Sequence, residues 1–195
     1  DALLSVPHEV SVKLRAYIDV LKQWQTSVNL VSHNSIQDIW LRHVADSLQL
    51  LEYIPDKQVR IADIGSGAGF PGMVLAIAGC QDVHLVESDR KKCMFLKEVA
   101  RISNVNVTIH CGRAESVRIP KITLATSRGC GSLSELLNIL YSWKQNNLVC
   151  LFHKGQSYSK ELDEAVAWEF DVNVLPSRVD ASGVILSITN IRKAA

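Results

Sequence analysis

The chain has 195 residues, of which 47% are hydrophobic and 21% are charged, a balance typical of a globular protein with a full core. No apolar run reaches the roughly 18 residues that a membrane-spanning helix requires, and no basic-then-apolar segment marks a secretory leader. The formal net charge is only +1, so a nucleic-acid partner would have to be bound by a local basic patch.

The first fifty residues are expected to be helical. Apolar side chains at spacings of three and four form one helix face: Val10, Leu14, Tyr17, Ile18, Leu21, Trp24 and Val28. A second helix is expected over about residues 35–53, with Pro55 closing it. No glycine occurs before Gly65, so the sequence predicts an N-terminal helical extension over residues 1–56, packed on a core unit of residues 57–195.

From Val59 onward, short apolar runs alternate with helical segments. Strands are expected at residues 59–64, 82–87, 106–110, 122–127, 148–154, 170–176 and 183–190. Helices are expected at about residues 71–79, 90–102, 132–143 and 158–168. This alternation predicts an α/β, Rossmann-like fold with a seven-stranded, mostly parallel sheet covered by helices on both faces. The last two strands have no helix between them and should form an antiparallel hairpin at the sheet edge.

The five cysteines include no CxxC pair and are odd in number: Cys80, Cys93, Cys111, Cys130 and Cys150. A disulfide framework or a zinc site is therefore not expected, and a reducing cytoplasm fits this pattern best. Most of these thiols are expected in or near the core. No cluster of His, Cys, Asp and Glu has ligand spacing, so no metal is expected either.

A glycine-rich loop follows the first predicted strand. The acid Asp63 ends that strand, and Gly65, Gly67 and Gly69 follow at alternate positions. Such a turn lets the backbone approach a ligand closely. Glu87 ends the second predicted strand, 22 residues beyond Gly65, where a carboxylate can accept hydrogen bonds from ribose hydroxyls.

The loop differs from the dinucleotide fingerprint GxGxxG, because Phe70 occupies the position of the third glycine. A bulky residue there argues against a pyrophosphate and hence against a nicotinamide-dependent dehydrogenase. The carboxylate of Asp63 suits a cationic ligand part, such as an α-amino group or a sulfonium. The pattern therefore favours S-adenosyl-L-methionine as the cofactor, with a purely structural glycine turn as the alternative.

Five stretches of this sequence resemble one family, the bacterial 16S ribosomal RNA guanine-N7 methyltransferases, also called glucose-inhibited division protein B. They are "LKQWQTSVNLVS" (21–32), "LRHVADSL" (41–48), "DIGSGAGFPGMVLAI" (63–77), "SRGCGSL" (127–133) and "HKGQ" (153–156). The resemblance implies a class I methyltransferase fold and a cytoplasmic enzyme. We expect the chain to act as a monomer, although the sequence itself is silent on oligomeric state. Its substrate would be N7 of one guanosine in the decoding-region loop of 16S rRNA, free or in the small ribosomal subunit.

The resemblance also implies roles for individual residues. Gly65 and Phe70 fall on the cofactor loop, and Ala114 and Glu115 fall on the pair that meets the adenine. Together with the glycine-loop argument, this gives an expected cofactor set of Asp63, Gly65, Gly67, Gly69, Phe70, Glu87, Ala114, Glu115 and Arg128.

Two cations match the motifs expected to position the substrate. Arg128 falls on the arginine beside the cofactor and the target base, and Lys154 falls on the lysine of the "KG" motif. Three neighbouring residues depart from the usual pattern. His153 is more polar than the residue that usually precedes the lysine, while Gly129 and Cys130 replace an alanine and an apolar or aromatic residue. These departures concern the shape of the pocket more than the reaction.

The chemistry implied by the resemblance requires no general base, because the N7 lone pair of guanine is already nucleophilic and no proton must leave. Catalysis would then consist mostly of positioning and exclusion of water. The chain has neither the "NPP[YF]" segment common in amino-group methyltransferases nor a Pro-Cys nucleophile. Arg128 could contact guanine O6, a phosphate or the cofactor carboxylate, or it could form a structural salt bridge.

Arg42, His43 and Asp46 share one face of the second expected helix. This face could border the site, or it could pin the N-terminal helices to the core. His43 is more readily structural than catalytic, since no proton transfer is needed.

RNA contacts could come from "DRKK" (89–92) with Lys97 and Arg101, unless that helix is simply solvated. Other possible phosphate contacts are Arg113, Arg118, Lys144, Lys154 and Lys160. The four tryptophans could stack on bases but fit core packing better: Trp24, Trp40, Trp143 and Trp168. A methyltransferase for a small molecule or protein, and a non-catalytic RNA-binding module, are the alternative functions.

Overall fold

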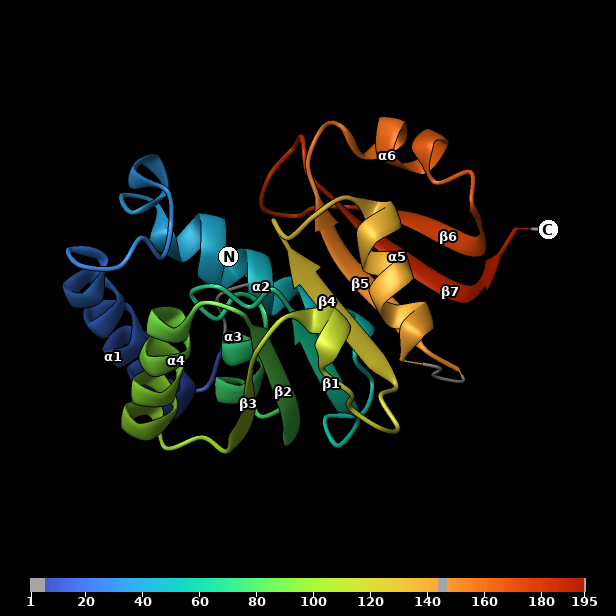
Figure 1. Cartoon of the computed structure of the whole chain (residues 1–195). Coiled ribbons are helices and arrows are strands. Elements are labelled where there is room, and N and C mark those ends of the chain that lie inside the picture. Colours follow the sequence, from blue (N-terminus) through green and yellow to red (C-terminus); the bar gives the residue numbers. More distant parts are fainter. Residues whose placement is uncertain (1–5, 144–146, 195) are drawn as a thin grey trace.

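The computed structural model describes residues 6–143 and 147–194. Its centre is one seven-stranded sheet of order β3-β2-β1-β4-β5-β7-β6 (Figure 1). The strands are β1 (Arg60–Ile64), β2 (Asp82–Glu87), β3 (Val107–Cys111), β4 (Leu124–Arg128), β5 (Val149–Lys154), β6 (Trp168–Pro176) and β7 (Val184–Lys193). Strands β1 to β5 are parallel, and β7 is antiparallel to both β5 and β6. The predicted sheet and its terminal hairpin are thereby confirmed.

The helices cover both faces of the sheet. They are α1 (His8–Gln25), α2 (Asp46–Leu48), α3 (Gly72–Ile77), α4 (Arg90–Ser103), α5 (Leu133–Ser142) and α6 (Tyr158–Glu164). One core cluster joins α1, α3 and α4 to one face of the sheet, and a second joins α5 to the other face. Figure 1 shows α1 beside α4 at the β3 end, with the β6–β7 hairpin at the opposite end.

The alternating burial of the strands explains why two cores form. Ile61 of β1 packs in the first cluster, whereas its neighbour Ala62 packs in the second. Successive side chains of a strand point to opposite faces, so a strand that is apolar throughout supplies both layers. This is the pattern expected of a parallel sheet buried on both sides.

Local capping residues set the helix boundaries. Asp89 accepts hydrogen bonds from the amides of Lys91 and Lys92 and so begins α4, which ends at Asn104 in the left-handed conformation. Ser132 and Glu135 form a reciprocal capping box at the start of α5. Both helices therefore begin shortly beyond the carboxyl ends of strands, α4 after β2 and α5 after β4.

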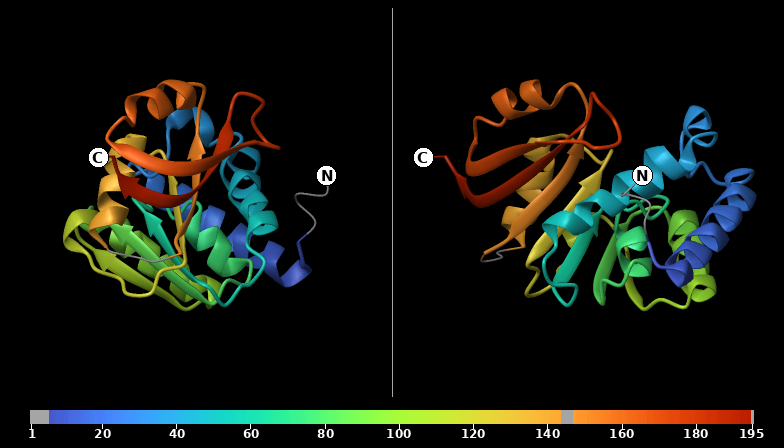
Figure 2. Two further views of the ribbon diagram at one scale, coloured as in Figure 1. Left: turned by 90° about the vertical axis from the view of Figure 1, so that its right-hand side faces the viewer. Right: turned by 180° about the vertical axis from the view of Figure 1, so that it is seen from behind.

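The expected continuous helix over residues 35–53 is wrong. The structure has a 3-10 turn (His33–Ser35), a π-helical segment (Trp40–Ala45), the short α2 and a second 3-10 turn (Gln49–Tyr53). The amide of Asp46 donates to the carbonyl of Leu41, a π-type bond, while the carbonyl of Arg42 accepts from Arg128 of β4. A tertiary contact thus competes with the regular helical ladder. Figure 2, seen from behind, shows this segment crossing the same face as α3.

The last expected helix is shorter than its pattern suggested. Helix α6 ends at Glu164, and Trp168 begins β6 rather than closing the helix. Trp168 packs edge-on against Tyr141, which fixes it as part of the hairpin. Trp24 packs against Phe95 in the first core. These tryptophans are therefore occupied by packing.

All five cysteines are free thiols, and Cys80, Cys93 and Cys150 are buried. Along the described part of the chain, no helix has both the length and the apolarity needed to cross a membrane. Lys144, one of the possible phosphate contacts, lies outside the described residues. The division between residues 1–56 and 57–195 stays a prediction, although both segments contribute side chains to the first core.

Candidate active site

A first cavity, of about 640 Å³, opens beyond the carboxyl ends of β1 and β2. We call it the loop cavity, because the glycine loop forms its floor. Its lining includes most of the expected cofactor set, together with a wall from the N-terminal segment: Leu30, Val31, Ser32, His43, Gly65, Ser66, Gly67, Ala68, Phe70, Glu87, Gly112, Arg113, Ala114, Glu115, Arg128, Gly129 and Cys130. Ligands of doubly wound folds bind at this edge.

Backbone conformation shapes the floor of the loop cavity. Gly65 and Gly67 have positive φ angles of 68° and 55°, which side chains rarely adopt. A Cβ on Gly65 would lie 2.2 Å from Sγ of Cys130, whereas one on Gly67 would meet only the Gly65 carbonyl oxygen, at 3.8 Å. The first glycine thus permits close packing on the β4 loop. The second leaves open space.

Glu87 holds the loop in place through its carboxylate. One oxygen accepts a hydrogen bond from the amide of Gly67 at 2.8 Å, and the other accepts from the amide of Asp89 at 2.8 Å. Each carboxylate oxygen has further acceptor capacity. Glu87 can therefore order the loop and still accept from a ligand hydroxyl.

Asp63 and Gly69, two members of the expected cofactor set, do not line the cavity. Asp63 is fully buried and accepts from the Thr126 hydroxyl at 2.8 Å. Burial raises the pKa of Asp63 to about 6. Gly69, with a φ of 96°, leaves room for the hydroxyl of Tyr17, which would lie 2.9 Å from an added Cβ. Both residues therefore shape the glycine loop from its buried side and do not line the cavity.

Phe70, which breaks the dinucleotide fingerprint, joins the loop to the N-terminal helices. Its ring stacks on Tyr17 at 5.3 Å and on His43 at 4.9 Å between ring centroids. The guanidinium carbon of Arg128 lies 5.1 Å from the same ring centroid. The Tyr17 hydroxyl also donates to the carbonyl of Ala68. The residues that close this end of the loop cavity thus come from four segments.

The expected adenine wall lies in a 3-10 helix (Ala114–Ser116) that follows β3. Ala114 and Glu115 both line the loop cavity. The indole nitrogen of Trp143 donates to the Ala114 carbonyl at 3.2 Å, so α5 holds this wall in position.

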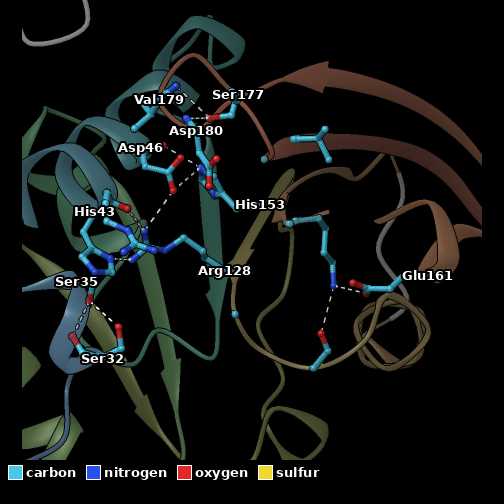
Figure 3. Close-up of a pocket in the computed structure, with 18 residues that line it drawn as sticks. Ser32, Ser35, His43, Asp46, Arg128, His153, Glu161, Ser177, Val179 and Asp180 are labelled. Carbon is cyan, nitrogen blue, oxygen red and sulfur yellow. Dashed lines mark hydrogen bonds and ion pairs between the residues drawn. The ribbon is translucent and has the colours of Figure 1, made fainter. Parts of the chain in front are cut away.

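A second cavity, of about 660 Å³, lies beyond the carboxyl ends of β4 and β5 (Figure 3). We call it the edge cavity. Most of its lining residues have polar or charged side chains: Ser32, Ser35, Arg42, His43, Asp46, Arg128, Gly129, Gly131, His153, Lys154, Gly155, Glu161, Ser177, Val179, Asp180, Ala181, Gly183 and Val184. It shares Ser32, His43, Arg128 and Gly129 with the loop cavity, so the two cavities adjoin at the end of β4.

Arg128 stands at this junction and is held by three partners. Its guanidinium donates to the Arg42 carbonyl at 2.8 Å and to the Asp46 carboxylate at 3.2 Å, and it contacts Nδ1 of His43. Burial, then the charges of Arg128 and Arg42, lower the pKa of His43 to about 3. His43 is therefore neutral near pH 7 and accepts from the guanidinium. Arg42, His43 and Asp46 all line the edge cavity, and their contacts with Arg128 also tie the N-terminal segment to β4.

The two side chains that end β5 are also held by neighbours. Nε2 of His153 lies 2.8 Å from the Asp46 carbonyl oxygen, which fixes it as the protonated nitrogen, and its buried Nδ1 has no hydrogen-bond partner among the described residues. Lys154 pairs with Glu161 at 2.7 Å and donates to the Gly131 carbonyl at 3.2 Å. Its side chain is only 8% exposed, so the proposed direct contact of its ammonium with RNA phosphate would require the Glu161 pair to open.

The other cations that were expected to contact RNA lie away from the junction of the two cavities. Lys92 and Arg113 border the loop cavity, whereas Arg101 forms an exposed ion pair with Glu98 on α4. Among the described residues, no group of three or more His, Cys, Asp or Glu side chains is placed to hold a metal ion.

Comparison with known proteins decides the family. The sequence profile of GidB, described as rRNA small subunit methyltransferase G, matches residues 11–182. The ribosomal RNA small subunit methyltransferase G of Rhodospirillum centenum is 40% identical over 191 residues, which are 97% of this chain and 88% of that protein. The chain belongs to this family. The resemblance predicted from its motifs is therefore confirmed.

Solved structures agree on the fold of this family member. A ribosomal protein L11 methylase from Lactobacillus delbrueckii subsp. bulgaricus superposes with a TM-score of 0.59 at 13% identity, covering 76% of this chain and 78% of that one. A variant of MtNAS in complex with S-adenosylmethionine gives a TM-score of 0.63 at 12% identity, covering 92% and 76%. At such low identity these likenesses concern the fold alone.

Two walls of the site were not assigned from the sequence. Residues 30–32 border the loop cavity, and residues 177–183 border the edge cavity. The first lies within a stretch quoted for the family resemblance, but nothing in it pointed to a ligand. The second reads as an ordinary Pro- and Gly-flanked turn. The register of β7 on β5 would have been needed to place it at the site.

Proposed function

We propose that this chain transfers a methyl group from S-adenosyl-L-methionine to N7 of a guanosine in the decoding-region loop of 16S rRNA. Family membership carries the proposal, because the matched residues 11–182 include the described residues of both the glycine loop and the N-terminal wall. The two adjoining cavities support it, since one can hold a cofactor while the other holds a base at the shared boundary.

The loop cavity fits the cofactor. The open space beside Gly67 lets a ligand approach the backbone, and the free acceptor capacity of Glu87 suits ribose hydroxyls. Ala114 and Glu115 would border the adenine, and Phe70 would close the inner end. Asp63 and Gly69 would act by shaping the loop. When bound, the cofactor supplies an electrophilic methyl group on a cationic sulfonium.

The N7 lone pair of guanine is already nucleophilic, so no side chain has to remove a proton from it. The residues of this chain then have to orient the guanine and exclude water. Arg128 would orient the base or the cofactor, since its guanidinium is already fixed at the junction of the two cavities. Lys154 would hold the wall of the edge cavity through Glu161. A neutral His43 is consistent with a positioning role.

The partner is then 16S rRNA or the small ribosomal subunit, met by a monomer in the cytoplasm. The nearly neutral chain would bind RNA through local cations at the rim, of which Arg113 and Lys92 lie closest to the loop cavity. We assign residues 1–56 to an N-terminal extension that completes the site and residues 57–195 to the methyltransferase unit.

The test uses labelled S-adenosyl-L-methionine with 16S rRNA, and separately with small subunits, from a strain that lacks this modification. We expect label at N7 of a single guanosine in the decoding-region loop. Comparing the two substrates identifies the form that is recognised. Label that appears only on protein or small molecules, or cofactor binding without any transfer to RNA, would contradict the proposal.

A further inference from the structure

We infer that the edge cavity holds the target guanine and that Asp180 selects it, by accepting hydrogen bonds from the N1–H and 2-amino groups of the base. This inference rests on the proposed function and adds to it the residue that sets base specificity. Asp180 lies in the turn between β6 and β7, at residues 177–183, a segment that lines the edge cavity but not the loop cavity.

Sheet register brings this turn to the site. Arg128 of β4 pairs with His153 of β5, and Lys154 of β5 pairs with Val184 of β7, which in turn pairs with Pro176 of β6. The carboxyl ends of β4, β5 and β6 therefore lie along one edge of the sheet. The turn that follows Pro176 stands beyond this edge, as Figure 3 shows for Ser177, Val179 and Asp180.

The turn is fixed by hydrogen bonds of its own. The Ser177 hydroxyl oxygen accepts from the amides of Val179 and Asp180 at 3.2 and 3.1 Å. Gln49, which is 1% exposed, donates to the same hydroxyl at 3.3 Å and accepts from the amide of Arg178 at 3.0 Å. A recognition group on this turn is therefore placed before the base arrives, which reduces the cost of ordering it on binding.

The charge of Asp180 sets it apart from the other acids of the cavity. Asp46 is paired with Arg128 and Glu161 with Lys154, whereas Asp180 is in no ion pair among the described residues. One of its oxygens, Oδ1, accepts from the amide and hydroxyl of Ser182 at 2.9 and 2.8 Å. These bonds orient the carboxylate and lower its pKa. Its other oxygen has no bonded partner in the described part of the chain.

The edges of guanine match this arrangement. N7 must face the boundary with the loop cavity, at Arg128 and Gly129, so that it meets the methyl donor. The N1–H and 2-amino donors lie on the far edge of the same ring system and face the remaining walls. A carboxylate accepts but does not donate, so it complements guanine there, whereas adenine would present the unprotonated N1.

The test compares two RNA substrates that differ only in the target base, guanosine or inosine. Inosine keeps N7 and N1–H but lacks the 2-amino group. The wild-type protein should methylate the guanosine substrate roughly tenfold or more faster, as expected for one hydrogen bond to a charged group. Asp180→Asn should slow methylation of guanosine and reduce this preference to about twofold or less, because an amide places a donor against the 2-amino group.

Ser182→Ala is the matched control, because it removes a hydrogen bond of the turn and leaves the carboxylate in place. It should keep the preference for guanosine. If Ser182→Ala loses the preference as Asp180→Asn does, the shape of the turn and not the carboxylate is responsible, and the inference fails. It also fails if the wild-type protein does not distinguish the two bases, or if Asp180→Asn still does. Transfer by the wild-type protein to neither RNA would instead contradict the proposed function.

Discussion

The floor of the loop cavity is shaped mainly by backbone conformation within one strand–loop–helix unit, whereas the edge cavity is shaped by side-chain contacts between distant segments. Gly65 and Gly67 form the first through their positive φ angles. Arg128, Asp46 and His153 form the second through bonds that span 82 to 107 positions in the sequence. The floor of the loop cavity should tolerate changes of side chain but not an added Cβ at Gly65. The edge cavity should depend on each of its charged partners.

The largest effect is expected from Gly65→Ala. Alanine at a φ of 68° is strained by roughly 1–2 kcal/mol, and its Cβ would overlap Sγ of Cys130 at 2.2 Å, which adds about 1–3 kcal/mol. The loop should relieve this strain by leaving its binding conformation. Affinity for S-adenosyl-L-methionine, measured by calorimetry, should fall by about three hundredfold or more.

Gly112→Ala is the matched control in the same cavity. An added Cβ there would meet only Val117, at an ordinary 3.9 Å, so affinity should change little. Equal losses in the two variants would show that the loop cavity is not defined by the glycine backbone in the way described.

An intermediate effect is expected from Arg128→Ala. It leaves the largely buried Asp46 carboxylate without its cation, which should lower the free energy of unfolding by about 1–3 kcal/mol. Methyl transfer should fall by roughly a hundredfold, because the base or the cofactor would no longer be oriented correctly for the reaction. Denaturant unfolding and single-turnover assays measure the two effects separately.

Arg128→Lys sharpens this test. Lysine keeps the charge but cannot hold three partners with one planar group, so stability should partly return while activity stays low. Full activity of folded Arg128→Ala on ribosomal substrate would contradict the placement of the site at this junction.

The smallest effect is expected from Lys154→Ala on the salt dependence of RNA binding. Because Lys154 is buried and paired with Glu161, its removal should lower the salt slope by clearly less than the roughly one unit expected for a phosphate contact. Arg113→Ala, at an exposed position on the rim, is the comparison and should lower the slope by about one unit. A full unit lost with Lys154→Ala would mean that the Glu161 pair opens when RNA binds.

The same contrast explains what could be predicted from sequence. The strands, the hairpin and the glycine loop follow from local periodicity and turn chemistry, and the structure has them close to their expected bounds. The irregular segment over residues 33–53 could not be predicted, because its π-type turn coincides with a carbonyl bonded to Arg128, far away in the sequence. The ion pair of Lys154 and the place of residues 177–183 likewise depend on strand register.

The stack of Tyr17, Phe70 and His43 bears on the modularity of the chain. Phe70 belongs to the glycine loop, yet its two described aromatic neighbours, Tyr17 and His43, both precede β1. A fragment of residues 57–195 would expose this ring and lose the wall formed by residues 30–32. We therefore expect the N-terminal helices to be required for cofactor binding rather than to act as a detachable accessory. A fragment that bound S-adenosyl-L-methionine as tightly as the full chain would refute this.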